Sequence, residues 1–361
     1  MKLKKWLIAV PLTLALAIGV AACGSSNDSG SSSGDAVSGE IAGAGASSQE
    51  AAMNAWIVAF QENNPDANIS YDPVGSGGGR EQFIAGGTSF GGTDSPMDET
   101  ELADVAKRCA PGQYIEIPVY IAPIAVAYNI DGVEELNLTA STMAQIFAGT
   151  ITKWNDPAIA ADNPDVDLPD QDVVVVHRSD ESGTTENFTD YLSQAAPKDW
   201  TYEPDGNWPI NKGEAANGTS GVISAINSGS GTIGYADLSQ VGDLNTVNVK
   251  VGNEYVAPSP EAAVKIFEAS KRIGGEGTYV FAYELDRTSS AAGLYPISLV
   301  SYEMACTEYK SAEEAKLVKA FYSFIISEEG QQAGAENAGT APIPDSLRQE
   351  ITPAVEAIQT S

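Results

Sequence analysis

Basic residues are scarce in this sequence, and histidine and cysteine are scarcer still. The chain of 361 residues contains 19 Lys and Arg against 49 Asp and Glu, with one His and three Cys. Residues 1–22 hold three of the basic residues and no acid, so the remainder carries a net charge of −33. This charge argues against nucleic acid, whose binding needs Lys and Arg to displace counterions, and against an anionic membrane surface as the main partner. One His excludes a His-rich zinc site, and we expect neither a metal nor a cofactor.

The first apolar run is too short to span a membrane comfortably. Residues 7–20 form a run of about fourteen residues, whereas a spanning helix needs about 20. Three lysines precede the run, and Val20-Ala21-Ala22-Cys23 follows it, which is the order of a lipobox. We therefore predict a lipoprotein signal peptide over residues 1–22 and lipid attachment to Cys23. The alternative is ordinary secretory cleavage beside a cysteine that stands there by chance.

The segment after this cysteine is mostly Gly, Ser, Asn and Asp. Such a composition buries too little apolar surface to fold. With the lipidated Cys23 it forms a predicted flexible tether over residues 23–39. Several lipid chains hold a soluble domain at a membrane. We therefore expect an exported protein that is lipid-anchored to the outer face of the cell membrane.

If Cys23 carries lipid, Cys109 and Cys306 remain. An exported compartment is oxidising, so this pair favours one disulfide. Two buried free thiols are the alternative. A metal site is excluded for lack of further ligands.

Strand patterns recur along the rest of the chain. Alternation predicts strands over residues 68–74 and 90–93, and a third over residues 114–128 that Pro118 and Pro123 interrupt. The β-branched run at residues 173–177 predicts a strand buried on both faces.

Helix signals stand between these strands. Ser47-Ser48-Gln49-Glu50 is typical of a capping box. Ser95-Pro96 indicates a second helix start with Pro at the first position. Residues 261–271 and 312–326 are also predicted helices. Strands that alternate with helices predict an α/β architecture, which binds ligands at loops leaving the carboxyl ends of strands.

Four loops share one chemistry. Each joins an expected strand to an expected helix and combines glycine with small hydroxyl side chains; the loops are residues 43–48, 75–79, 91–96 and 178–185. Free backbone N–H groups at a helix start suit a tetrahedral oxyanion. Any one of them is more typical of a plain turn, and Ser47 alone of a helix cap. All four, with one Arg and one Asp among them, favour a shared anion site.

These motifs resemble the PstS-type phosphate-binding lipoproteins of bacterial phosphate ABC importers, members of the periplasmic-binding-protein superfamily. The resemblance covers about residues 40–345 and rests on Gly-Ala-Gly-Ala-Ser at 43–47, Gly-Ser-Gly-Gly-Gly at 75–79, Phe-Gly-Gly-Thr-Asp-Ser-Pro at 90–96 and Arg-Ser-Asp-Glu-Ser-Gly-Thr at 178–184. It implies a two-lobed periplasmic-binding-protein fold. Each lobe is a mixed, doubly wound sheet flanked by helices, and strand crossovers join the lobes. The expected lobe boundaries are residues 40–118 plus 297–361 for lobe 1 and 119–296 for lobe 2.

The resemblance also implies the ligand, one dehydrated inorganic phosphate. Carried over by position, its contacts are Ser47, Ser48, Ser76, Asp94, Arg178, Ser182, Gly183 and Thr184. Two positions depart from the family pattern. Ser48 replaces the usual Phe, and Glu181 replaces the usual Gly. The implied partners are the permease and ATPase subunits of an importer, and the protein is expected to be a monomer.

Three residues have distinct expected roles. Arg178 supplies a planar cation that suits two oxygens. Asp180 either pairs with Arg178 or caps a helix. Asp94 accepts a hydrogen bond from protonated phosphate, which sulfate cannot offer, so we hypothesise discrimination of about 10⁴–10⁵. The alternative for Asp94 is a turn or cap residue.

Some features of the sequence suggest functions other than anion binding. Ser182 suggests a hydrolase nucleophile, but His177 is the only His and lies in or beside a buried strand, and Gly-x-Ser-x-Gly is missing. A receptor for sulfate, molybdate or a phosphonate and a signalling lipoprotein with a degenerate site are further alternatives. We predict a binding protein and not an enzyme.

Overall fold

The computed structural model describes residues 36–273 and 278–361. The predicted signal peptide over residues 1–22, the lipid attachment at Cys23 and the tether up to residue 35 lie outside the described residues. In the described part, no helix combines the length and the apolarity that crossing a membrane requires.

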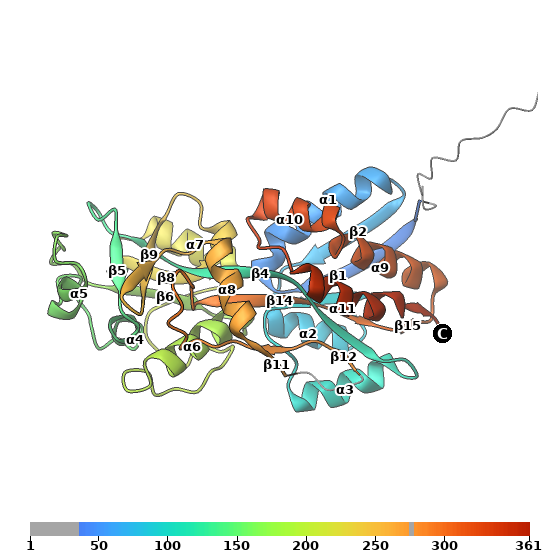
Figure 1. The fold of residues 1–361 in the computed structure, drawn as a ribbon, viewed down its shortest axis with the longest axis horizontal. Helices are drawn as coiled ribbons and strands as arrows, with labels where there is room; N and C mark the ends of the chain where they lie inside the picture. Colours follow the sequence, from blue (N-terminus) through green and yellow to red (C-terminus); the bar gives the residue numbers. More distant parts are fainter. Residues whose placement is uncertain (1–35, 274–277) are drawn as a thin grey trace, which may run out of the picture. The chain divides into compact units, whose positions relative to one another are not determined.

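One mixed sheet of 12 strands organises residues 36–361. In its first part, β2 (Ala67–Asp72), β1 (Gly39–Gly45) and β3 (Phe90–Thr93) lie side by side and run parallel. Then β14 (Ser298–Cys306) pairs antiparallel with β3 on one side and with β4 (Tyr114–Asn129) on the other. Figure 1 shows β4 and β14 adjacent in the middle of the sheet.

The second part of the sheet begins where β4 changes partner. Its residues 124–129 pair antiparallel with β8 (Thr232–Asp237). Next come β6 (Val174–Arg178), parallel to β8, and β7 (Glu214–Ala216), parallel to β6. β9 (Asn245–Val251) also joins the end of β4. The short strands are β5 (Leu136–Leu138), β10 (Glu254–Val256), β11 (Lys271–Arg272), β12 (Tyr279–Val280), β13 (Tyr283–Glu284), β15 (Glu308–Tyr309) and β16 (Gln359–Thr360).

β4 is continuous, so the prediction that Pro118 and Pro123 interrupt it is wrong. Its pairing with β14 skips Val119, where Tyr302 faces Pro118 and Ser301 faces Tyr120. A bulge tolerates a proline because the ladder bond is already missing there. Pro123 ends the pairing with β14, just before β4 turns to β8.

Helices cover both parts of the sheet. The remaining elements are η1 (Ser47–Gln49), α1 (Glu50–Asn63), α2 (Ser76–Ile84), α3 (Glu99–Cys109), α4 (Ala140–Phe147), α5 (Pro157–Asp162), α6 (Gly183–Ala195), α7 (Gly218–Ser228), η2 (Leu238–Gln240), α8 (Pro260–Ala269), α9 (Ala312–Ile325), α10 (Glu328–Ala338) and α11 (Asp345–Glu356). Around β1, the ring of Phe321 lies 5.4 Å from Phe60 and 5.9 Å from Phe90. A Cβ on Gly43 would stand 2.2 Å from the Phe90 ring, so this close approach needs glycine. The predicted α/β architecture is confirmed.

Two helix starts differ from the prediction. No capping box forms at residues 47–50, because the Ser47 hydroxyl contacts Thr219 instead and α1 begins at Glu50 without a side-chain cap. The helix predicted to start at Ser95-Pro96 begins at Glu99. There Asp98 accepts hydrogen bonds from the N–H groups of Thr100 and Glu101, at 2.7 and 2.8 Å, and so fixes the later start.

Cys109 ends α3 and Cys306 ends β14, and the two form a disulfide. The favoured interpretation of this pair is confirmed. The β-branched run is only partly as predicted, because Val176 is buried whereas Val174 and Val175 are half-buried.

Candidate functional site

The four polar loops meet around Asp94. Ser48, after β1, donates a hydrogen bond to Asp94 Oδ2. Ser76, at the start of α2, accepts one from the Asp94 N–H at 3.1 Å. Thr184, in the first turn of α6, donates to Asp94 Oδ2 at 3.2 Å. The structure therefore brings to Asp94 residues that lie 18, 46 and 90 positions away from it in the sequence.

The Asp94 carboxylate is 2% exposed and surrounded by hydroxyl groups. Its Oδ1 accepts from Ser301 Oγ at 2.6 Å, while its Oδ2 accepts from Ser48 and Thr184. Burial raises the pKa of Asp94 above its ordinary value, and the three hydroxyl donors and the charge of Arg178 oppose this shift. An ionised carboxylate has about four acceptor positions, so room remains for a further donor.

Arg178 ends the buried strand β6 and is itself 3% exposed. Its Nε donates to Asp180 Oδ1 at 2.8 Å, and its Nη2 donates to Asp180 Oδ2. Burial raises the pKa of Asp180, but the bonds and charge of Arg178 outweigh burial and leave it below its ordinary value. Asp180 thus pairs with Arg178, while the cap of α6 is Ser182. A residue only two positions away in the sequence therefore fixes the orientation of the Arg178 guanidinium.

Helix α6 begins directly at this loop. Ser182 is its N-cap and accepts from the Thr185 N–H at 3.2 Å. A Cβ on Gly183 would stand 2.7 Å from Ser76 Oγ and 2.8 Å from Asp94 Cβ, so only glycine fits at this contact. The N-terminal end of α6 therefore lies against Ser76 and Asp94, where its partial positive charge favours an anion.

Ser47 joins a different group. Its Oγ lies 3.0 Å from Thr219 Oγ1 and accepts a 3.0 Å bond from the Thr219 N–H. Gln240 Nε2 donates to the carbonyls of Ser47 and Ser48, at 2.8 and 3.2 Å. Thr219 and Gln240 were missed in the sequence, where nothing distinguishes them from other polar residues.

Arg80 was also missed, and it accounts for the unusual Glu181. Its Nη2 lies 2.9 Å from Glu181 Oε1, and its Nε lies 2.8 Å from Glu101 Oε1. A Cβ on Gly77 would stand 1.2 Å from Glu181 Oε2, so the glycine of the second loop makes space for this carboxylate. Glu181 is therefore part of a partly buried ion-pair cluster that joins two of the loops. A signal was available, since Arg80 directly follows the glycines.

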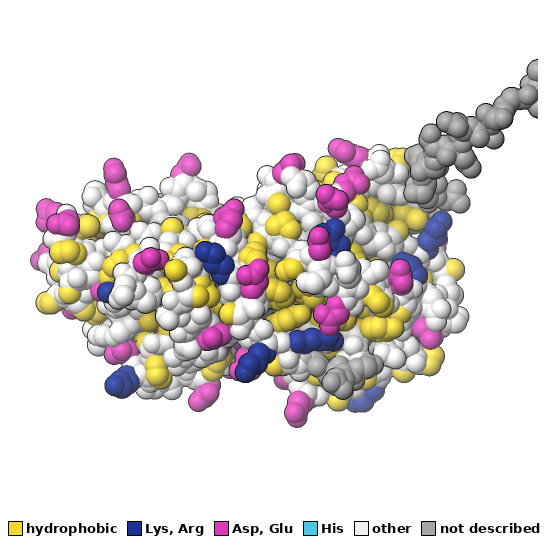
Figure 2. All heavy atoms as spheres, viewed as in Figure 1, with side chains coloured by type: hydrophobic (Ala, Val, Ile, Leu, Met, Phe, Trp, Pro, Cys, Tyr) yellow, Lys and Arg dark blue, Asp and Glu magenta, His cyan; other side chains and the backbone are white. Residues whose placement is uncertain are grey.

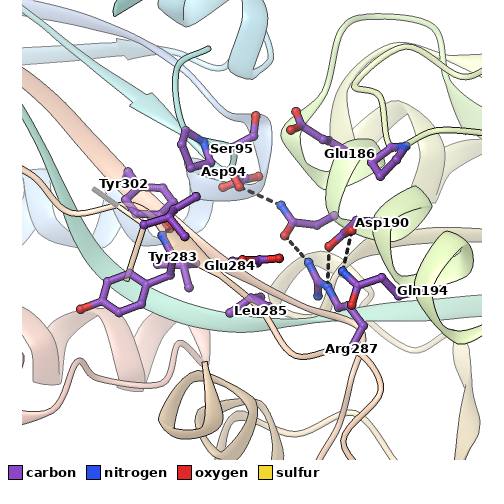
Figure 3. Close-up of a pocket in the computed structure, with 15 residues that line it drawn as sticks. Asp94, Ser95, Glu186, Asp190, Gln194, Tyr283, Glu284, Leu285, Arg287 and Tyr302 are labelled. Carbon is purple, nitrogen blue, oxygen red and sulfur yellow. Dashed lines mark hydrogen bonds and ion pairs between the residues drawn. The ribbon is translucent and has the colours of Figure 1, made fainter. Parts of the chain in front are cut away.

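A cavity of about 220 Å³ borders Asp94 on another side. Asn187, on α6, donates to the Asp94 carbonyl at 2.7 Å and accepts from Arg287 Nη2 at 2.6 Å. Arg287 in turn donates from Nε to Asp190 at 3.0 Å, and Figure 3 shows this chain of side chains reaching from Asp94 to Arg287. The backbone of Asp94 is thus held from the same helix that contributes Thr184.

His177 has a structural environment. Its ring stacks on Trp208 at a centroid distance of 5.2 Å, and its Nδ1 donates to the Arg178 carbonyl at 2.9 Å. The Ser182 hydroxyl is engaged as a helix cap. The pair therefore lacks the geometry of a nucleophile and its base.

Known proteins resemble this chain over most of its length. The family model of the PBP superfamily domain matches residues 30–329. The phosphate-binding protein PstS 3 of Mycobacterium leprae is 36% identical over 99% of this chain and all of its own length. The phosphate-binding protein PstS of Methanocaldococcus jannaschii is 33% identical over 81% of this chain and 79% of its own length.

Solved structures give the same fold. The crystal structure of a phosphate-binding protein from Stenotrophomonas maltophilia superimposes with a TM-score of 0.69 at 18% identity, covering 88% of this chain and 94% of that one. The predicted two-lobed periplasmic-binding-protein fold is confirmed by such neighbours. The relatives are binding proteins and not enzymes, so the prediction of a non-enzyme is confirmed as well. This chain belongs to the PstS family of phosphate-binding proteins within the PBP superfamily.

Proposed function

We propose that this chain binds one inorganic phosphate ion at the meeting point of its four polar loops. The contacts would be Ser47, Ser48, Ser76, Asp94, Arg178, Ser182, Gly183 and Thr184. The observation that carries the proposal is the buried Asp94, which hydroxyl groups from three other segments contact. A carboxylate at the N-terminal end of a helix and near a buried arginine suits an anion that still carries a proton.

The groups divide by chemistry. Arg178 supplies a fixed cation, because Asp180 holds its guanidinium by two bonds. Gly183 and Thr184 supply backbone N–H groups at the first turn of α6. Hydroxyl groups donate to the remaining oxygens, and each hydrogen bond to a charged group is worth about 1.5–3 kcal/mol. A set of this size supports micromolar affinity or better, about −8 kcal/mol.

Asp94 would select the ligand. Phosphate near neutral pH keeps a proton that an acceptor can bind, whereas sulfate would face the carboxylate oxygen to oxygen. A site that hydrogen-bonds a hydroxyl rejects an analogue lacking it by about 10⁴–10⁵. The proposed selectivity for phosphate over sulfate thus depends on one ionised side chain.

The net charge of the chain does not forbid this ligand. Figure 2 shows acidic side chains dispersed over the visible face rather than gathered in one patch. Exposed charges beyond a Debye length, about 8 Å at physiological salt, are largely screened. Local dipoles and Arg178 therefore decide the affinity. We expect affinity to change little with salt, while association becomes faster as salt screens the overall field.

Closure of two lobes would enclose the ion. We propose residues 40–118 plus 297–361 as lobe 1 and residues 119–296 as lobe 2, with β4 and β14 next to the crossover. The support is that β4 pairs with β14 before residue 124 and with β8 after it. The contacts of Asp94 with Thr184 and of Ser47 with Thr219 would then join the lobes.

Delivery to an importer completes the proposal. The closed protein would dock on the permease of a phosphate ABC importer driven by its ATPase subunits. Processing after residue 22 and lipid attachment to Cys23 would hold the monomer at the outer face of the cell membrane. Labelling with a radioactive fatty acid, compared between the unmodified chain and Cys23→Ala, tests the anchor.

Isothermal titration calorimetry of residues 36–361, which form one compact unit, tests the ligand. Phosphate and arsenate should bind, and sulfate should not. Asp94→Asn should lose most of the preference for phosphate. Sulfate binding as tight as phosphate binding by the unmodified domain would remove the selectivity argument.

A further inference from the structure

Gln49 is linked to Asp94 through the hydroxyl of Ser301, and hydrogen bonds fix the orientation of its amide. Its Nε2 donates to the carbonyl of Tyr302 at 2.9 Å. A carbonyl can only accept, so the atom facing it must be the nitrogen. The same nitrogen donates to Ser301 Oγ at 2.8 Å, and Oε1 accepts from Tyr71 at 3.2 Å.

The hydroxyl proton of Ser301 therefore points to Asp94. Because Ser301 Oγ accepts from Gln49, its own O–H points to another acceptor. That acceptor is Asp94 Oδ1, at 2.6 Å. Gln49 donates to Ser301 and Ser301 donates to Asp94, so the hydrogen bonds run in one direction and end at the carboxylate. Each of the three residues is at most 2% exposed.

The backbone around Gln49 and Ser301 supports this series of hydrogen bonds. Ser301 stands on β14 at the bulge opposite Val119, whose carbonyl accepts from Gln331 Nε2 at 2.9 Å. A Cβ on Gly92 would stand 2.0 Å from Gln49 Oε1, so the third loop leaves space for the amide. Bulges are common beside functional sites, where they re-aim a side chain.

Three hydroxyl groups thus occupy three acceptor positions of Asp94. Ser48 and Thr184 use Oδ2, and Ser301 uses one position on Oδ1. The remaining position on Oδ1 can receive only a donor. Ser48 and Thr184 are also proposed ligand contacts, whereas Ser301 has no such role.

We propose that Gln49 and Ser301 are positioning residues that keep Asp94 an acceptor and thereby set its preference for a protonated oxyanion. The inference rests on the proposed phosphate site. A directed donor stabilises the ionised carboxylate, which keeps one acceptor position on Oδ1 open for a donor of the ligand. Without it, Asp94 takes up a proton more readily and can then donate to sulfate.

Other titratable groups act on the same carboxylate. Arg178 favours its ionised form. Asp237, Tyr71 and Tyr120 also lie within electrostatic range of Asp94. Their side chains are unchanged in every variant below. Ser301→Ala also removes the hydroxyl that interacts with Tyr120, whereas Gln49→Met keeps that hydroxyl.

The main test is Ser301→Ala in residues 36–361, with Ser298→Ala as the matched control. Ser298 is equally buried on the same strand, and its hydroxyl donates to the Tyr295 carbonyl at 2.9 Å. Phosphate and sulfate affinities are measured by calorimetry from pH 5 to pH 8. We expect Ser301→Ala to bind phosphate about ten- to a hundredfold more weakly, with the loss of affinity at acid pH moved to higher pH. Sulfate binding should be unchanged or improved.

A second variant, Gln49→Met, keeps Ser301 and adds no charge. It frees the Ser301 proton, so we expect a smaller shift of the acid limb in the same direction. If circular dichroism shows that Ser301→Ala does not fold, the affinities of Gln49→Met test the inference instead. The inference is wrong if phosphate affinity, sulfate affinity and the acid limb match those of Ser298→Ala, or if both anions weaken equally without a pH shift. If the unmodified domain binds no phosphate, the proposed function fails first.

Discussion

Two buried arginines stand beside the polar loops, and they are held in different ways. Arg178 pairs with Asp180, two residues away in the same loop. Arg80 pairs with Glu101 and Glu181, which are 21 and 101 positions away. The orientation of the Arg178 guanidinium therefore depends only on its own loop. The contacts of Arg80 form only when separate segments of the chain pack together. The first arrangement suits a ligand contact, and the second suits a tie between loops.

The largest expected difference between them is in affinity. Arg178→Met should weaken phosphate binding by at least about a hundredfold, because it removes the fixed cation and up to two charged hydrogen bonds. Calorimetry of residues 36–361 measures this loss. Arg80→Met, as the comparison, should weaken binding far less. Equal losses in the two variants would contradict the division of roles.

Arg80→Met should also lower the stability of the fold. Arg80→Met leaves Glu101 and Glu181 without their cation, at side-chain exposures of 23% and 28%. Losing one partner of a buried pair costs about 3–5 kcal/mol. Since both carboxylates can regain water, we expect about 2 kcal/mol. Urea unfolding measures the free energy.

The double variant of Arg80→Met and Glu181→Gln is the control. It removes one of the unpaired charges, so it should recover part of the loss of stability. A double variant less stable than Arg80→Met alone would show that Glu181 stabilises the loop in another way.

The same contrast explains what the sequence could predict. The strand-to-helix loops are local patterns, and β6 ending at Arg178 followed by the start of α6 could be expected from adjacent residues. The predicted capping box at Ser47 was wrong because the Ser47 hydroxyl hydrogen-bonds Thr219, which is 172 positions away. Pairings of that range are decided by the fold and leave no periodic trace in the chain.

The structural residues behind Asp94 were missed for the same reason. Ser301 lies in an otherwise ordinary buried strand, and Gln49 lies beside serines that drew attention as a cap. Only the pairing of β14 with β3, which faces Tyr302 with Thr93, places Ser301 next to the third loop. Local sequence motifs could thus predict the proposed ligand contacts, but not the residues that position Asp94 from within the core.

A buried carboxyl group that is hydrogen-bonded by a tyrosine gives a further contrast. Glu116 is fully buried, and burial raises its pKa to about 7 despite a 2.7 Å bond from Tyr114. The folded state then holds a proton that the unfolded state releases near pH 4.5. Stability should therefore fall as pH rises from about 4.5 to 7 and level off above this range.

Glu116→Gln tests this effect. The amide needs no proton, so the variant should lose part of the slope and gain about 1–3 kcal/mol at pH 8 relative to the parent. Asp237 has a pKa raised to about 7 in the same way, and its slope should persist. Urea unfolding at pH 4.5, 6 and 8 gives the profile. A variant with the full slope of the parent would assign the effect to Asp237 or to Glu303, whose pKa burial also raises.

The smallest effect is expected where ion pairs face water. Lys153 lies 3.0 Å from Asp170 and 3.1 Å from Asp172, and all three side chains are exposed. Exposed pairs contribute little because solvent screens them and ordering long side chains costs entropy. Lys153→Ala should leave the melting temperature within error of the parent, in contrast to Arg80→Met. A drop as large as that of Arg80→Met would mean that burial does not decide which ion pairs stabilise this fold.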